Sequence, residues 1–190
     1  MQRWFVSALC VCVLLVGSLP AQAQRPRSVL DQQTGATLSL AAEPWLFARD
    51  QPHLAAHARD YVGLYAVDIN TAGTHRTFLA VFFWSTIDRR KGFAGEAPRV
   101  ELMVDDRRVI LTPGNESARD LGISAWPLTP PGKGAVFQVY AVDATLLRQL
   151  AESRFTSVRL LDDIDGDDEP LLTWKEGRRA LAEFAKAQLD

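Results

Sequence analysis

Residues 61–84, YVGLYAVDINTAGTHRTFLAVFFW, decide the fold of this chain. Two apolar runs, at residues 61–69 and 75–84, flank the segment 70–73, whose Asn, Thr, Ala and Gly favour a compact turn. Two β-prone runs separated by such a turn predict an antiparallel hairpin. We therefore expect this hairpin to be the centre of the protein.

The second run of the hairpin is apolar on both of its faces. Side chains alternate along a strand, so every second residue points to the same side of the sheet. One face carries Phe78, Ala80, Phe82 and Trp84, and the other carries Leu79, Val81 and Phe83. A strand with two apolar faces is typical of a position that is covered on both sides.

The rest of the chain also favours strands, most of them joined by hairpin-length links. Asp105 and Asp106 separate two short apolar runs and predict a second tight hairpin. We expect about seven or eight strands in all, with a short one near Trp126. The further strand candidates are residues 37–40, 99–104, 107–111, 135–142, 155–161 and 170–174.

Two helices are expected in the C-terminal half. Asp143 can cap the first, because its side chain can accept the free amides of the first turn. The second, near residues 176–189, places Leu181, Phe184, Ala185 and Leu189 on one stripe. The predicted class is mainly β (α+β): an antiparallel β-sandwich or curved sheet, with a short helix near 143–152 and a C-terminal amphipathic helix near 176–189.

The N-terminus has the pattern of an export signal. Arg3 precedes an apolar run at residues 4–19, and small residues surround a predicted cleavage after Ala23. This predicts a signal peptide (1–23), a flexible leader (24–34) and a single β-rich domain (35–190) in the periplasm, or else secretion. Cys10 and Cys12 both lie inside the signal. Cleavage therefore removes any disulfide, thiolate metal site or cysteine nucleophile.

Charge and hydropathy exclude two kinds of partner. The chain has 21 Lys and Arg against 23 Asp and Glu, a formal net charge of −2. This near-balance gives no electrostatic basis for binding nucleic acid. After the signal, no apolar stretch approaches the roughly 20 residues of a membrane helix. We therefore expect no nucleic-acid partner and no integral membrane span after cleavage.

Two clusters could in principle bind a metal ion. The acidic segment 162–169, with Asp163 and Asp165, has the oxygen ligands that calcium prefers, but it does not fit the EF-hand spacing. A solvated hairpin turn explains it better. His53 and His57 are spaced i and i+4 and would share a helical face, yet such a pair in a polar segment is usually a surface feature. We predict no metal site and no cofactor.

The segment 84–90, WSTIDRR, combines an aromatic, hydroxyl and charged side chains at the end of the predicted central strand. Its binding candidates are Trp84, Ser85, Asp88 and Arg89. No Gly-x-Ser-x-Gly element supports a hydrolase. The simpler interpretation is that Ser85 or Thr86 caps the next turn, while Asp88 and Arg89 form a structural pair that fixes the loop.

The C-terminal third carries a recurring pattern: residues 140–143 (YAVD), Leu147-x-x-Leu150-Ala151, and residues 158–160, 172–174 and 179–181. In this pattern the chain resembles small exported proteobacterial proteins of unknown function. The resemblance implies an antiparallel β fold in the periplasm, and it implies no activity or catalytic residue.

Three functions remain open from the sequence. The first is an exported periplasmic binding or accessory module without catalysis, whose ligand is an envelope protein or a glycan. The second is a periplasmic hydrolase or carbohydrate-active enzyme that uses carboxylates such as Asp88 or Asp68 with a histidine. This enzyme would need a cleft where Trp84, Asp88 and a histidine converge. The third is a metal-binding module.

Overall fold

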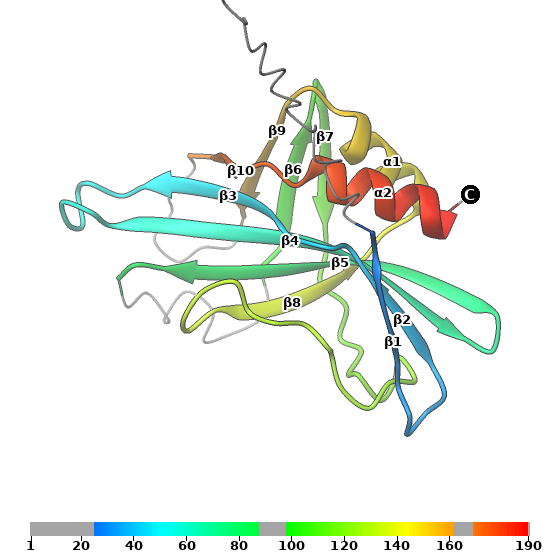
Figure 1. The fold of residues 1–190 in the computed structure, drawn as a ribbon. Helices are drawn as coiled ribbons and strands as arrows, with labels where there is room; N and C mark the ends of the chain where they lie inside the picture. Colours follow the sequence, from blue (N-terminus) through cyan, green and yellow to red (C-terminus); the bar gives the residue numbers. More distant parts are fainter. Residues whose placement is uncertain (1–24, 88–97, 162–168, 190) are drawn as a thin grey trace, which may run out of the picture.

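The computed structural model describes residues 25–87, 98–161 and 169–189. Within these ranges the protein is mainly antiparallel β with two helices, which confirms the predicted class (Figure 1). The described elements are β1 (Arg27–Leu30), β2 (Thr37–Leu40), β3 (Trp45–Asp50), β4 (Arg59–Thr71), β5 (Thr74–Ser85), β6 (Val100–Val104), β7 (Arg107–Leu111), β8 (Val136–Ala141), α1 (Ala144–Glu152), β9 (Thr156–Leu160), β10 (Leu171–Lys175) and α2 (Arg178–Leu189).

The β4–β5 hairpin forms as predicted and runs through the middle of the molecule (Figure 1). Its strands pair continuously from Thr71 opposite Thr74 to Asp60 opposite Ser85. The turn consists of Ala72 and Gly73, with φ values of 51° and 88°. Two consecutive positive φ angles match the twist of paired strands, and glycine adopts the second without strain.

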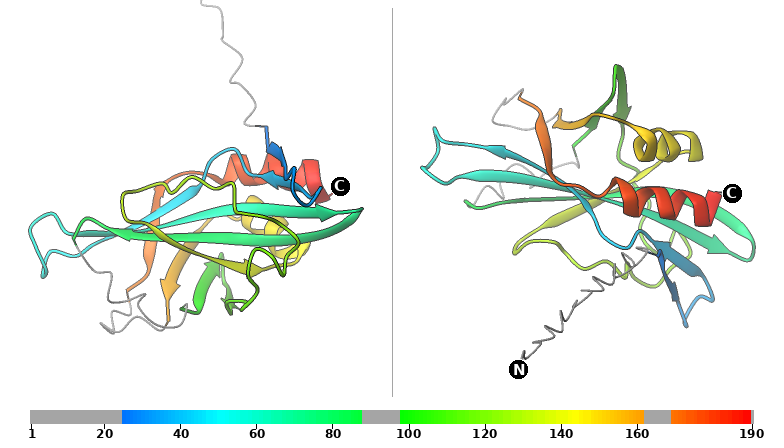
Figure 2. Two further views of the ribbon diagram at one scale, coloured as in Figure 1. Left: turned by 90° about the horizontal axis from the view of Figure 1, so that it is seen from below. Right: turned by 45° about the horizontal axis from the view of Figure 1, so that its top comes forward.

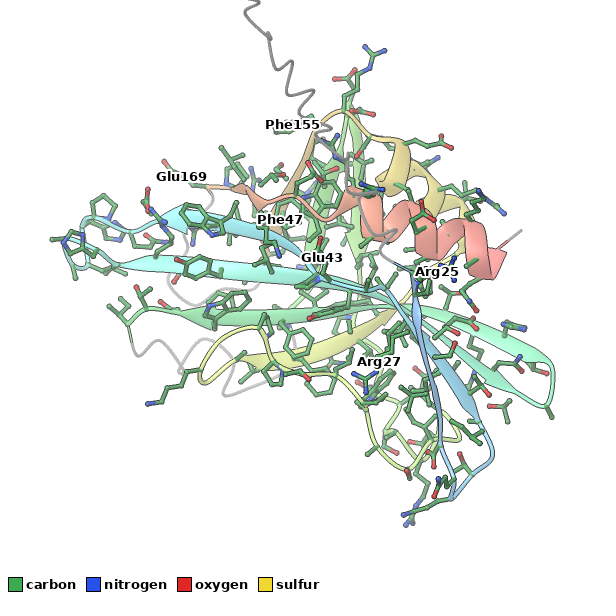
Figure 3. The ribbon with its side chains drawn as sticks, viewed as in Figure 1. Arg25, Arg27, Glu43, Phe47, Phe155 and Glu169 are labelled. Atoms are coloured by element: carbon green, nitrogen blue, oxygen red, sulfur yellow. The ribbon has the colours of Figure 1, made fainter. Side chains whose placement is uncertain are left out.

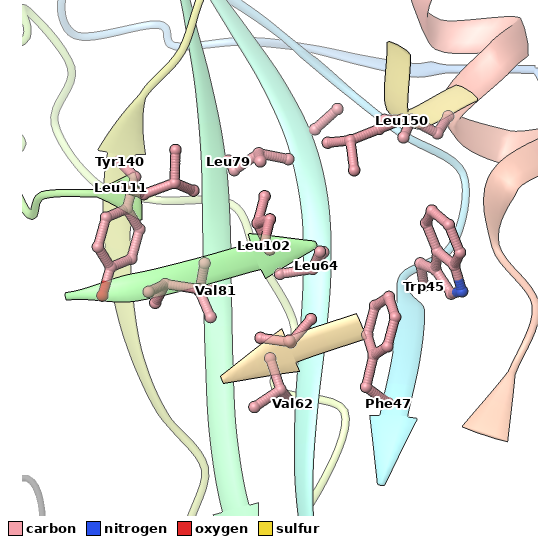
Figure 4. Packing of buried hydrophobic residues seen from close by; sticks show 14 of the residues in the cluster. Trp45, Phe47, Val62, Leu64, Leu79, Val81, Leu102, Leu111, Tyr140 and Leu150 are labelled. Atoms are coloured by element: carbon pink, nitrogen blue, oxygen red, sulfur yellow. The ribbon is translucent and has the colours of Figure 1, made fainter. Parts of the chain in front are cut away.

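The two faces of β5 are buried in two separate apolar clusters, as its sequence predicted. Leu79, Val81 and Phe83 belong to the larger cluster, which β6, β9 and both helices complete (Figure 4). Phe78 and Phe82 belong to a second cluster on the opposite side. Side chains of β2 and of the segment 112–135 cover that second cluster. The β4–β5 hairpin therefore lies between two apolar cores and contributes side chains to both.

The other edge of β4 pairs with two strands in succession. β2 occupies the part of this edge at residues 67–70, and β3 occupies residues 59–64. From β3 the pairing continues through β10, β9 and β6 to β7, while β8 extends β5 on the other side. Figure 1 shows β6, β7 and β9 running crosswise to the long hairpin.

The two helices pack against each other on one side of the sheet (Figure 2). The Asp143 carboxylate accepts the backbone N–H of Leu146 at 2.7 Å, which confirms the predicted cap of α1. Leu147 and Leu150 of α1 and Phe184 of α2 are fully buried in the larger core. Along the described stretches of chain, neither helix has the length and apolarity that crossing a membrane requires.

Three local features differ from the sequence-based predictions. β1 lies within the stretch 24–34 for which we expected a flexible leader, because its backbone pairs with β2. β3 was not predicted; its two edges pair with β4 and β10, and its Trp45 and Phe47 side chains are buried in the larger core. The segment near Trp126 forms no strand, and the indole packs its edge against Phe78 instead.

Candidate functional site

Trp84, a predicted binding residue, lies directly opposite Tyr61 in the β4–β5 hairpin. Their rings stack with centroids 5.1 Å apart and planes 6° apart. Both side chains are partly exposed. Directly opposed aromatic side chains on one sheet face attract each other beyond simple burial, so this pair also fixes the open end of the hairpin.

β10 brings Trp174 to the same place from the far end of the chain. Its ring meets Tyr61 edge-on, with centroids 6.2 Å apart, and 56% of the residue is exposed. The Arg59 guanidinium lies 4.4 Å from the centroid of the Trp174 ring, within range of a cation–π interaction. We call Arg59, Tyr61, Trp84 and Trp174 the aromatic cluster.

Strand alternation explains why these side chains share one face. Residues 59 and 61 of β4 point the same way, and the register places residue 84 of β5 beside them. β10 pairs Leu172 with Ala48 of β3, which lies opposite Tyr61. Leu172 is 51% exposed and extends the apolar surface.

The Pro- and Gly-rich segment 112–135 borders the cluster on the side of Trp84. A methyl group at Gly132 would lie 2.5 Å from indole atoms of Trp84, so the backbone packs directly on the ring. Pro131 approaches Gly63 beside the same indole. The faces of the Trp84 ring are therefore occupied by Tyr61 and by this segment, and its edge remains for contact with solvent.

Two of the described cations near the cluster are paired with carboxylates. Arg59 donates a 2.5 Å hydrogen bond to Asp50. The Asp50 carboxylate, with the Tyr61 hydroxyl, raises the pKa of Arg59 above its ordinary value, so the guanidinium stays charged. Lys175 pairs with Glu43 at 2.8 Å. Each of these two cations is therefore balanced by a carboxylate.

A surface recess of about 440 Å³ lies next to Arg59 and Tyr61, and exposed His57 contributes to its lining. Thr86 closes this region by accepting the Arg59 N–H at 2.8 Å and donating to the His57 carbonyl at 3.2 Å. Ser85 donates to the Arg59 carbonyl and accepts from the N–H of Ile87, both at 3.3 Å. The Ser85 hydroxyl therefore has a structural role in this turn.

The metal candidates show no ligand arrangement in the described parts of the chain. His53 and His57 are exposed and lie in turns between β3 and β4, so the helical spacing that would align them does not apply. No group of three or more His, Cys, Asp or Glu side chains gathers there in a way that could hold an ion. Asp163 and Asp165 lie outside the described residues.

Asp68 and His75 form the one histidine–carboxylate contact among the described side chains. His75 Nδ1 is 2.8 Å from Asp68 Oδ2, and the Asp68 side chain is buried. Asn70 Nδ2 lies 3.1 Å from His75 Nε2, the nitrogen that a general base would need free. This network sits seven to nine residues along β4 from Tyr61, which is roughly 23 to 30 Å at 3.3 Å per residue.

Trp84 and the Asp68–His75 pair therefore do not converge. They lie at opposite ends of the hairpin and on opposite faces of β5. Ala23, Asp88 and Arg89 lie outside the described residues. Of the other two tryptophans in the described residues, Trp45 is 2% exposed in the larger core and Trp126 is partly buried in the second.

Sequence reasoning missed Arg59, Tyr61 and Trp174 as site residues. A usable indication existed for Tyr61: a two-residue turn at Ala72 and Gly73 fixes Tyr61 opposite Trp84. No comparable indication existed for Trp174, because its place depends on pairing between β10 and the distant β3.

Comparison of the chain with protein-family models, with curated proteins and with solved structures found no match. Function is therefore inferred from the residues themselves.

Proposed function

We propose that this protein is an exported, periplasmic binding module without catalytic activity, and that the aromatic cluster is its contact surface for a partner protein. The observation that carries the proposal is the exposed Trp174, held in place by Arg59 and Tyr61. The N-terminal export pattern supports a location in the periplasm.

The residue types of the cluster favour a protein interface. Trp, Tyr and Arg dominate the few positions that carry most of the binding energy between proteins. Here they are pre-positioned by ring stacking and by the Arg59–Asp50 ion pair, which lowers the entropy lost on binding. The exposed Leu172 adds apolar area beside them.

The ring geometry favours a protein over a glycan. Sugars stack on open faces of aromatic rings, whereas Tyr61 and Trp84 cover each other and Trp84 also meets Gly132. Arg59 lies over the Trp174 ring. What remains for a ligand is mostly ring edges and aliphatic side chains, which suit an apolar protein surface.

The pairing of Arg59 and Lys175 with carboxylates also indicates which kind of partner surface fits the cluster. Because Arg59 and Lys175 are both neutralised by carboxylates, these two cations add little net charge for steering. We expect an apolar, nearly neutral partner surface, with binding that depends little on salt.

The test is site-specific photo-cross-linking of the exported protein in intact cells. A cross-linking side chain at position 172, beside the cluster, is expected to capture a defined partner. A matched control carries the same side chain at position 30, because Leu30 is 61% exposed and belongs to β1, the strand whose Arg27 is labelled well away from β10 in Figure 3. Equal capture from both positions, or none from position 172, would refute the proposal.

A further inference from the structure

A second surface pocket lies where β7, the end of β8 and the start of α1 meet. Its volume is about 210 Å³. It is lined by residues of β7, by residues 141–143 and by three residues of α1. It shares no lining residue with the aromatic cluster, so whatever it binds is independent of the proposed function.

One side of this pocket is apolar and belongs to the larger core. Leu111 and Leu146 are buried members of that core, and Val109 and Val142 pack against it. The base of this wall is therefore already removed from water. A short aliphatic group placed here gains about 25 cal/mol for each Å² of apolar surface removed from water.

The same pocket is lined by one cation and one anion. The Arg107 guanidinium donates to Gln149 Oε1 at 2.9 Å. This hydrogen bond joins the Arg107 side chain of β7 to helix α1. Asp143 accepts the Leu146 N–H at 2.7 Å, and this cap uses one carboxylate oxygen. Within the described residues neither charge has an ion-pair partner, and the two do not pair with each other.

We propose that this pocket binds a small apolar α-amino acid in its zwitterionic form. The Arg107 guanidinium binds the carboxylate, for which its remaining N–H donors are suited. The free oxygen of Asp143 binds the ammonium group. The aliphatic side chain lies against Val109 and Leu146. The volume is below that of pockets for drug-sized ligands and suits a ligand of amino-acid size.

Arg107 and Asp143 are both needed to bind this zwitterion. Together they disfavour ligands that carry only a carboxylate or only an ammonium group. A carboxylate without an ammonium group would leave Asp143 as an unfavourable neighbour. An amine without a carboxylate would place its positive charge near the positive charge of Arg107, which is equally unfavourable. The pocket therefore selects a zwitterion over either ion by electrostatic complementarity.

The test is isothermal titration of the full signal-cleaved chain with four probes: leucine, 4-methylpentanoate, 3-methylbutylamine and glycine. We expect saturable leucine binding with a Kd of about 1 mM or tighter. The two single-charge probes and glycine should bind about tenfold more weakly or not at all. No saturable leucine binding up to about 10 mM would overturn the proposal. Equal binding of either single-charge probe would do so as well.

Two variants locate the site without disturbing the fold. Asp143→Asn removes the charge but keeps a good helix cap, and Arg107→Gln removes the guanidinium from an exposed position. Both should lower leucine affinity about tenfold, with an unchanged circular dichroism spectrum and Tm. Arg119→Gln, at an exposed position outside the pocket, is the matched control. Wild-type affinity in both pocket variants would place any binding elsewhere and refute the assignment.

Discussion

The carboxylate of Asp31 accepts the backbone N–H of Ser124, 93 residues further along the chain. Asp31 also accepts the N–H groups of Gln33 and Thr34. One buried side chain therefore joins the β1–β2 turn to the segment that covers the second core.

This contact predicts a specific dependence of stability on pH. The Ser124 N–H, followed by the other donors, lowers the pKa of Asp31 from 3.8 to about 2. A carboxyl group whose pKa is lower in the folded state stabilises the fold above its unfolded pKa and loses that contribution as pH falls. The contribution of Asp31 is therefore complete above about pH 4 and lost on approach to pH 2.

The measurement is urea unfolding of wild type and Asp31→Asn at several pH values. The variant should be less stable at pH 6, and the difference should shrink between about pH 4 and pH 2. A difference that stays constant over this range would mean that the charge of Asp31 contributes nothing.

The contact between Gly132 and Trp84 predicts sensitivity to a single methyl group. In Gly132→Ala the new Cβ would meet the indole at 2.5 Å, so the segment or the ring must move. We expect a loss of about 1–3 kcal/mol in the free energy of unfolding and altered tryptophan fluorescence. Gly114→Ala is the control, because its Cβ meets only the flexible end of Glu116. The proposed packing would be wrong if both variants behaved alike.

The Asp68–His75 pair is predicted to be structural. His75→Ala would leave the buried Asp68 carboxylate without this donor, and we expect a loss of about 1–3 kcal/mol. A double-mutant cycle with Asp68→Ala measures the coupling, and the effect of His75→Ala should become smaller in that background. Additive effects would show that the hydrogen bond contributes little.

The docking of α2 depends on Phe184, which is fully buried in the larger core. Phe184→Ala should cost about 3–5 kcal/mol in urea unfolding, through lost transfer energy and the cavity left behind. Phe155→Ala, at an exposed position, should change stability by less than about 0.5 kcal/mol. A small loss in Phe184→Ala would contradict the described packing of the helix.

Local sequence patterns account for the parts of the fold that were predicted. The β4–β5 hairpin, its two apolar faces and the Asp143 cap depend on residues close together in the chain. The tight turn at Asp105 was also predicted, and the structure shows why glycine is not required there. Asp105 adopts a φ of 51°, and its carboxylate accepts the N–H groups of Arg154 and Phe155.

Long-range pairing accounts for the parts that were not predicted. Trp174 reaches Tyr61 only because β10 inserts between β3 and β9, strands more than 100 residues apart. Nothing local to Leu171–Lys175 specifies that neighbour. β1 likewise has four residues with mostly exposed side chains, so its order depends on β2 and on Asp31.

The affinity of the cross-linked partner for Trp174 variants tests the proposed function most directly. Wild type, Trp174→Ala and Leu30→Ala would be titrated with the purified partner at low and high salt, because Leu30 is exposed and lies far from the cluster. We predict a loss of at least about 30-fold for Trp174→Ala, no change for Leu30→Ala, and little effect of salt. Binding of Trp174→Ala within about twofold of wild type, or equal losses in both variants, would contradict the assignment of the aromatic cluster as the binding surface.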